Sequence, residues 1–170
     1  MIIEKMFDIP VLFSKLEHDF FKLTQFEIGR VVDSISWTCP PSLENTQKLS
    51  TSNFCQNWIE SNNCFSLMNV INQHLSDYCK YFGFEDLPEY TMHSWVTCNE
   101  KGSYSIAHDH AMADVSGVYY YKTDSNDGNL YFNTPVNSSN ASRLMLGYHM
   151  SRHVIPEEGK LVLFPGFLQH

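Results

Sequence analysis

Three histidines are the residues of this sequence whose types and spacing most directly suggest chemistry. His108 and His110 stand one residue apart in Ala-His-Asp-His-Ala, and His170 follows Phe-Pro-Gly-Phe-Leu-Gln. Successive side chains of a β-strand alternate between its faces, so His108 and His110 would point the same way and Asp109 the other. A third imidazole from a distant strand would complete three ligands on a metal and leave positions open for a substrate. The pattern therefore predicts a catalytic metal site.

The composition limits the class of protein that could carry such a site. The 170 residues fit one domain, and the net charge of −8 comes without any run of Lys or Arg, which argues against a groove for nucleic acid. The five cysteines are an odd number and form no C-x-x-C pair, which argues against a disulfide framework and a zinc ribbon. The sequence has neither a signal-peptide pattern nor a long apolar run. These features predict a soluble cytoplasmic protein that does not bind membranes.

The first half of the chain, as far as Pro88, has the pattern of helices. Capping-box spacing at Ser14 and apolar residues at Leu16, Phe20 and Leu23 predict a helix over about 14–25. A second helix is predicted over 66–82, and a short one over 54–60 lies in the polar connection between them. The second helix has Gly83 at its expected C-cap. Its predicted apolar stripe is Leu67, Ile71, Leu75, Tyr78 and Phe82.

The second half of the chain has the pattern of short strands. Runs of β-branched and aromatic residues alternate with turn residues such as Asn126-Asp127-Gly128 and Glu157-Glu158-Gly159. Six or more such strands favour a sandwich or barrel of the jelly-roll kind, with the helices packed on one sheet. Antiparallel wrapping would bring an early and a late strand side by side, as the three histidines require. The predicted strands are 90–98, 104–110, 115–121, 129–133, 144–150 and 160–164.

A family resemblance emerges from the order of several short motifs across the second half. This half resembles the non-haem Fe(II)- and 2-oxoglutarate-dependent oxygenases, in particular a group of small oxygenases from bacteria and phages. The matching residues are Trp95, Lys-Gly-Ser-Tyr-Ser at 101–105, His108-x-His110, Ser-Gly-Val-Tyr-Tyr at 116–120, Gly-Asn-Leu-Tyr-Phe at 128–132 with Pro135, Gly-Lys-Leu-Val-Leu-Phe-Pro at 159–165, and His170.

The resemblance implies a fold, a pair of cofactors and a reaction. The fold would be a double-stranded β-helix within one domain, residues 1–170, with a helical part over about 1–88 and a jelly-roll part over about 89–170. Fe(II) would be held by His108, His110 and His170, with 2-oxoglutarate and dioxygen as cosubstrates. The expected outcome is hydroxylation of an unactivated C–H bond in a small molecule or peptide, with release of succinate and carbon dioxide.

Two departures from the wider superfamily affect the site. The usual triad has Asp or Glu where this chain has His110, so Asp109 and Asp114 are alternative ligands; a regular strand would point Asp109 away, and Asp114 would need a bulge or turn to reach the metal. We favour His110. The superfamily also places an arginine for the far carboxylate of 2-oxoglutarate on the strand after the distal histidine. We expect that the final strand is cut from this chain; Arg143 and Arg152 are the guanidiniums available as replacements.

Two tyrosines are further candidates for binding 2-oxoglutarate. The run Ser116-Gly-Val-Tyr-Tyr is similar to the Thr-x-x-Tyr-Tyr run of prolyl hydroxylases, and the resemblance gives Tyr120 the bond to the cosubstrate carboxylate. Strand alternation places Tyr120 on one face with Val118, and leaves open which face lines the cavity. Tyr104 has the same parity as His108 and is the second candidate.

Two other functions remain open from the sequence. The first is a cupin-like metalloprotein in which three histidines bind zinc, manganese or iron without 2-oxoglutarate. The second is a non-enzymatic jelly-roll module with incidental histidines. Stoichiometric metal binding separates the first from the second, and chelator-sensitive turnover of 2-oxoglutarate separates the oxygenase from both.

Overall fold

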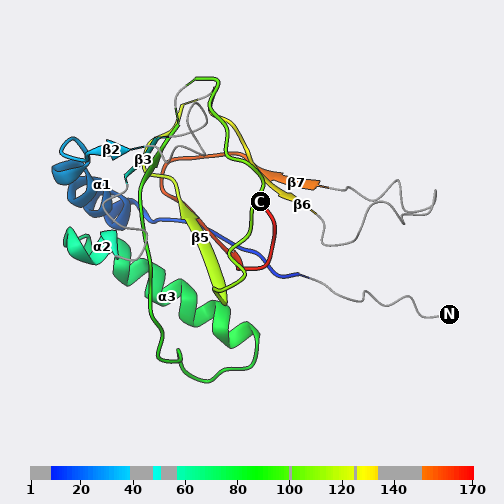
Figure 1. Ribbon diagram of the computed structural model, residues 1–170. Helices are drawn as coiled ribbons and strands as arrows, with labels where there is room; N and C mark the ends of the chain where they lie inside the picture. Colours follow the sequence, from blue (N-terminus) through cyan, green and yellow to red (C-terminus); the bar gives the residue numbers. More distant parts are fainter. Residues whose placement is uncertain (1–8, 39–47, 51–56, 100, 125, 134–150) are drawn as a thin grey trace, which may run out of the picture. The chain divides into compact units, whose positions relative to one another are not determined.

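A computed structural model describes residues 9–38, 48–50, 57–99, 101–124, 126–133 and 151–170 (Figure 1). The chain folds as two compact units. We call Met1–Ser14 with Ala107–His170 the histidine unit, and Lys15–Ile106 the helical unit. The helical unit ends at Ile106, and the N-terminal segment as far as Ser14 groups with the C-terminal one. In the described part of the chain, no helix has the length and apolar character needed to span a membrane.

The described residues of the helical unit form three helices and one small antiparallel sheet. The sheet has the order β2-β3-β4. The helices α1 and α3 pack against each other, and α3 also contacts α2. The elements are α1 (His18–Val32), β2 (Trp37–Thr38), β3 (Lys48–Ser50), α2 (Trp58–Ser61), α3 (Phe65–Tyr81) and β4 (Thr97–Cys98).

The helix α3 follows its predicted span and part of its predicted stripe, whose members Ile71 and Leu75 are half-buried. It spans Phe65–Tyr81, buries Leu67, Val70 and Tyr78, and is followed by Gly83 at φ +88°, the left-handed conformation that favours glycine. Phe82, predicted on the same stripe, is exposed, and its ring packs edge-on against Tyr78 at 5.2 Å between centroids.

The helix α1 departs from its prediction in position and in its buried face. Residues 14 and 15 belong to β1, and the helix begins at His18 without a side-chain cap. Phe20 and Leu23 are exposed, while Thr24 and Ile28 form the buried line. The predicted stripe is therefore wrong at Phe20 and Leu23, whereas Leu16, just before the helix, is buried as predicted. The fully buried member of the observed line is a threonine, which a search for apolar spacing cannot find.

Glu27 of α1 caps the start of α3. Its two carboxylate oxygens accept hydrogen bonds from the backbone N–H and the hydroxyl of Ser66, both at 2.9 Å. Cys64, the N-cap residue, supplies no side-chain cap of its own. A carboxylate at a helix N-terminus also interacts favourably with the positive end of the helix dipole. This contact joins the two long helices at one point.

In the part of the histidine unit that the structure describes, the chain forms five short strands. They are β1 (Leu12–Lys15), which ends at the boundary between the units, β5 (Val115–Tyr119), β6 (Leu130–Asn133), β7 (Ser151–Val154) and β8 (Lys160–Pro165). The sheet order is β1-β8-β5, and β6 pairs with β7. The pairs β5–β8 and β6–β7 are antiparallel. Of the predicted strands, 115–121, 129–133 and 160–164 correspond to β5, β6 and β8; of 90–98 only Thr97–Cys98 is a strand, and 104–110 contains none. The predicted strand at 144–150 lies outside the described residues.

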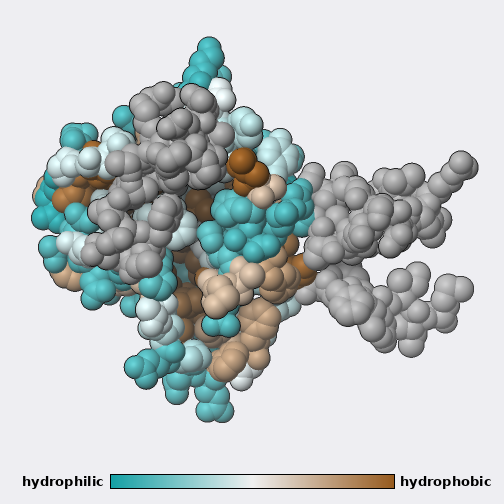
Figure 2. Space-filling model, in the orientation of Figure 1, coloured by the Kyte–Doolittle hydropathy of each residue, from teal (hydrophilic) through white to brown (hydrophobic). Residues whose placement is uncertain are grey.

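The core of the histidine unit lies between its two antiparallel pairs. Phe132, Val154, Val162, Phe164 and Leu168 form one buried cluster. Val118 of β5 and Tyr120, the residue just after this strand, pack against this cluster, so the face that they share points inward. Apolar side chains also lie on the surface of the protein. Figure 2 shows hydrophobic residues (brown) among hydrophilic ones (teal) on the visible face.

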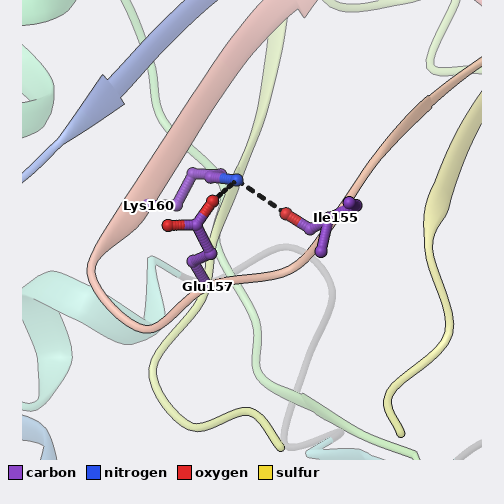
Figure 3. Close-up of polar contacts among 3 residues, drawn as sticks. All are labelled: Ile155, Glu157 and Lys160. Carbon is purple, nitrogen blue, oxygen red and sulfur yellow. Dashed lines mark hydrogen bonds and ion pairs between the residues drawn. The ribbon is translucent and has the colours of Figure 1, made fainter. Parts of the chain in front are cut away.

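The turn between β7 and β8 is held by one lysine (Figure 3). The ammonium of Lys160 donates to the backbone oxygen of Ile155 at 2.7 Å and pairs with the carboxylate of Glu157. Gly159 adopts φ +79° immediately before the strand, as the predicted turn requires. The turn sets the start of β8, the strand that leads to His170.

Candidate metal centre

The segment that carries His108 is joined directly to the segment that carries His170. The N–H of His108 donates to the oxygen of His170, and the N–H of His170 donates to the oxygen of His108, both at 2.9 Å. This reciprocal pair is the pattern of two residues directly opposite each other in an antiparallel ladder. Residues 103–110 form no regular strand, yet this pairing turns both imidazoles to the same side.

A tight turn after His110 fits against Gly166. The N–H of His110 donates to the oxygen of Gly166 at 2.8 Å, and the N–H of Ala113 closes the turn on His110 at 2.7 Å. A Cβ built on Gly166 would lie 2.0 Å from the oxygen of Ala113 and 2.6 Å from that of His110. Only a residue without a side chain fits this approach, so Gly166 positions His110.

The segment that carries His170 is held on its other side by β6. The N–H of Asn133 donates to the oxygen of Gln169 at 2.9 Å, and its side-chain amide donates to the Gln169 amide oxygen at 3.0 Å. His170 therefore follows a backbone hydrogen-bonded on both edges. Such pairing limits the freedom of the ligand segment before any metal binds.

The structure brings the three histidines together. Their ring centroids are 4.5 Å apart for His108 and His170, 5.0 Å for His108 and His110, and 5.2 Å for His110 and His170. Each ring offers one ligand atom, and the three atoms all lie within 4.8 Å of one another. His108 is exposed, while His110 and His170 are half-buried. The cluster is therefore reachable from solvent on one side.

The ring of His170 is oriented by its own backbone. Its Nδ1 lies 3.0 Å from the oxygen of Leu168. A carbonyl oxygen only accepts, so Nδ1 carries the proton and Nε2 keeps its lone pair for a metal. Neutral imidazoles within this distance of one another suit Fe(II) or Zn(II). The residues present thus fit a metal ion.

The electrostatics of the cluster favour neutral rings. Burial lowers the pKa of His110, and the neighbouring His108 and His170 lower it further, against an opposing effect of Asp109. Burial also lowers the pKa of His170, and the hydrogen bond to Leu168 opposes this. A lowered pKa keeps the imidazole deprotonated at neutral pH, which is the form that binds metal.

Two aromatic side chains of the buried core pack near the ring of His170. The ring of Phe164 lies 4.8 Å from that of His170, and the ring of Phe132 lies 6.4 Å from it. The two phenylalanines themselves pack edge-on at 4.8 Å. The metal centre therefore continues directly into the buried core of the histidine unit.

The two alternative carboxylate ligands lie outside this group of three. Among the described residues, the set close enough to share a metal contains His108, His110 and His170 only. The Asp109 carboxylate accepts a hydrogen bond from the N–H of Ala111 at 3.2 Å, which engages it in a local turn. Asp114 is exposed, and its backbone oxygen accepts from Gly166. Both remain alternatives for experiment.

The candidates for binding 2-oxoglutarate fall in different places. Tyr120 packs against the core, and burial raises its pKa to about 12. Arg152 is exposed on β7, directly opposite Phe132. Tyr104 belongs to the helical unit and is exposed, and Arg143 lies outside the described residues.

Sequence reasoning missed three residues that position the ligands. Gly166, Asn133 and Phe164 fix His110 and His170 through close approach, hydrogen bonds and ring packing. A Pro-Gly pair marks a turn in any sequence, so Pro165-Gly166 carried a usable signal. Nothing in the sequence pattern marks Asn133.

Comparison with known proteins links the second part of the chain to one family. Residues 93–170 match a family model described as "Putative 2OG-Fe(II) oxygenase", and this range contains all three histidines. The family implies an oxygenase whose cofactors are Fe(II) and 2-oxoglutarate, and His108, His110 and His170 could hold the iron. A search of curated proteins found no match.

Proposed function

We propose that this chain is an Fe(II)- and 2-oxoglutarate-dependent oxygenase that hydroxylates an unactivated C–H bond, with His108, His110 and His170 as the protein ligands of iron. The observation that carries the proposal is the convergence of three imidazoles whose ligand atoms lie within 4.8 Å of one another. The family match over residues 93–170 supports it, because that range contains every ligand.

We further propose that residues 1–170 form one oxygenase domain around a double-stranded β-helix. The strand pairing, the shared core and the backbone hydrogen bonds of the histidine unit support this fold. The pairs β5–β8 and β6–β7 share one core, and backbone hydrogen bonds place His170 between His108 and the end of β6. Two antiparallel layers around a shared core are the arrangement of a jelly roll.

The residues of the site would each have a definite task. His170, held at Nδ1 by the backbone oxygen of Leu168, would present Nε2 to the metal, and Phe164 packs edge-on against its ring. Burial raises the pKa of Tyr120 to about 12, so its hydroxyl stays protonated even above the usual range of a tyrosine and would donate to a carboxylate of the cosubstrate. When bound, Fe(II) and 2-oxoglutarate supply the oxidation, with succinate and carbon dioxide as coproducts and one oxygen atom of dioxygen inserted into the C–H bond.

A cupin-like metalloprotein without 2-oxoglutarate is the second candidate. The observation that favours it is the donor set itself, which consists of imidazoles and includes no carboxylate among the described residues. Three neutral ligands leave the full charge of a divalent metal uncompensated by the protein. Such a site suits zinc, manganese or iron bound without a dicarboxylate cosubstrate.

Binding and consumption of 2-oxoglutarate separate the two candidates. The protein is loaded anaerobically with Fe(II), titrated with 2-oxoglutarate by calorimetry, and then exposed to air while succinate is measured. The proposal predicts binding that requires the metal, succinate formation that a chelator abolishes, and loss of both in His170→Ala. Iron binding without 2-oxoglutarate binding would instead establish the cupin-like alternative.

A further inference from the structure

The helix α1 (blue in Figure 1) carries a narrow stripe of exposed side chains along one side. We call Asp19, Leu23, Phe26 and Arg30 the α1 stripe. These residues are spaced four, three and four positions apart, which lines them up on one side of a helix with 3.6 residues per turn. Thr24 and Ile28, the buried residues of α1, project from the opposite side. The stripe is therefore a second face of the helix, turned away from its buried line.

The middle of the α1 stripe is apolar. The side chain of Phe26 is 67 % exposed and that of Leu23 is 52 % exposed, and the exposed Phe20 lies beside them. Neighbouring large apolar side chains on a helix surface mark a contact site, because removing them from water is favourable. Alternating steps of three and four residues are also the spacing of the seam between two paired helices. The middle of the stripe thus suits burial against another helix.

The two ends of the α1 stripe carry opposite charges. Asp19 stands in the first turn of the helix and Arg30 in the last. The guanidinium of Arg30 lies 5.5 Å from the centre of the Phe26 ring, so it extends along the stripe. Two copies of α1 side by side in parallel would place like charges together at both ends. An antiparallel pair would instead place each acid beside a base, so the charge pattern favours that orientation.

We propose that the α1 stripe is the interface of a two-fold symmetric dimer, in which α1 pairs antiparallel with α1 of a second copy of this chain. With the axis between Thr24 and Gln25, Leu23 of one copy packs on Phe26 of the other. The same alignment places Asp19 opposite Arg30, and symmetry repeats each contact. A single helix face is smaller than the roughly 800 Å² per partner of a standard interface, so we expect a dissociation constant of roughly 10–100 µM.

Sedimentation velocity of the whole chain over a range of protein concentrations tests the dimer. We expect a monomer–dimer equilibrium, and a dissociation constant about 10-fold higher or more in Phe26→Asp, which places a carboxylate at the apolar centre twice. Phe84→Asp is the matched control, because Phe84 is an exposed phenylalanine of the same unit outside α1. Its dissociation constant should stay within about twofold of that of the unaltered chain.

An exchange of charges tests the antiparallel alignment. Asp19→Arg makes both ends of the stripe positive and Arg30→Asp makes both negative, so each variant alone should dimerise about 10-fold more weakly. An equimolar mixture of the two variants should form a mixed dimer, because every end contact is then attractive. The double variant Asp19→Arg/Arg30→Asp should pair with itself again. Glu85→Arg, at an exposed acid outside α1, should leave the dimer unchanged.

Several outcomes would overturn the proposal. The first is a monomer at every protein concentration up to about 1 mM. The second is a dimer that Phe26→Asp leaves intact, or one in which neither the mixture nor the double variant recovers association. The third is a monomer that Phe26→Asp destabilises in urea, which would assign the stripe to another part of the same chain. These measurements are made without metal, so their outcome is independent of the proposed function.

Discussion

The histidine unit and the helical unit are held together in contrasting ways. In the helical unit, long regular helices meet through a buried line on α1, a buried stripe on α3, and one polar contact between Glu27 and Ser66. In the histidine unit, the three histidines lie in irregular backbone, before β5 for His108 and His110 and after β8 for His170. Individual backbone hydrogen bonds fix these segments. Regular packing gives stability, whereas irregular backbone with specific partners places ligands.

This contrast predicts that equal losses of core packing have unequal effects on metal binding. Phe164→Ala should cost about 3–5 kcal/mol and Leu67→Ala about 2–5 kcal/mol of unfolding free energy, because both side chains are buried. Only Phe164 contacts a histidine of the cluster, so only its loss should also weaken Zn(II) binding. Urea unfolding and metal titration measure the two effects.

A milder variant keeps this comparison usable if Phe164→Ala does not fold. Phe164→Leu retains most of the volume and removes the ring that packs on His170. Equal metal affinities in Phe164→Leu and the unaltered protein would show that the core does not position the ligand.

The close approach at Gly166 gives the next largest effect. Gly166→Ala forces a Cβ against the backbone oxygens of Ala113 and His110, so we expect a loss of about 1–3 kcal/mol and a weaker affinity for Zn(II). Gly128→Ala is the matched control, because a Cβ there meets nothing within 4 Å. Chemical unfolding and calorimetry of the two variants should differ; equal behaviour would contradict the positioning role.

The polar contact of the helical unit should affect stability alone. Glu27→Gln replaces one acceptor oxygen by a donor facing Ser66, and we expect a cost of about 1–2 kcal/mol from the lost charge-assisted bond at the start of α3. Glu85→Gln, an exposed acid in the same unit, should change stability by less than about 0.5 kcal/mol. Zn(II) affinity should stay the same in both variants, as measured by titration.

The sequence predicted the parts of this molecule that follow a regular period. The helix α3, with Leu67 and Tyr78 buried and Gly83 in the left-handed region, was predictable because each turn repeats the same spacing. Likewise, β8 reads as a continuous apolar run after Lys160 and is buried from Leu161 to Pro165. The α1 prediction failed because its most buried residue, Thr24, is polar and the apolar Leu23 faces solvent.

The candidate site was predictable in its ligands and less so in its supports. The spacing of His108 and His110 pointed to a shared side, although irregular backbone rather than a regular strand brings this about. The role of Gly166 depends on the approach of a turn that is distant in sequence, and that of Asn133 depends on the register of β6 against the segment that carries His170. Neither register nor close approach is encoded in local spacing.

The most direct test of the metal centre is an anaerobic Fe(II) titration of the unaltered protein beside His108→Ala, His110→Ala, His170→Ala and Asp109→Asn. We predict one Fe(II) per chain, a loss of affinity above about 100-fold in each histidine variant, and no comparable loss in Asp109→Asn. Circular dichroism should confirm that the variants fold. Unchanged affinity in His110→Ala together with lost binding in Asp109→Asn would contradict the three-histidine centre and assign the third ligand to the carboxylate.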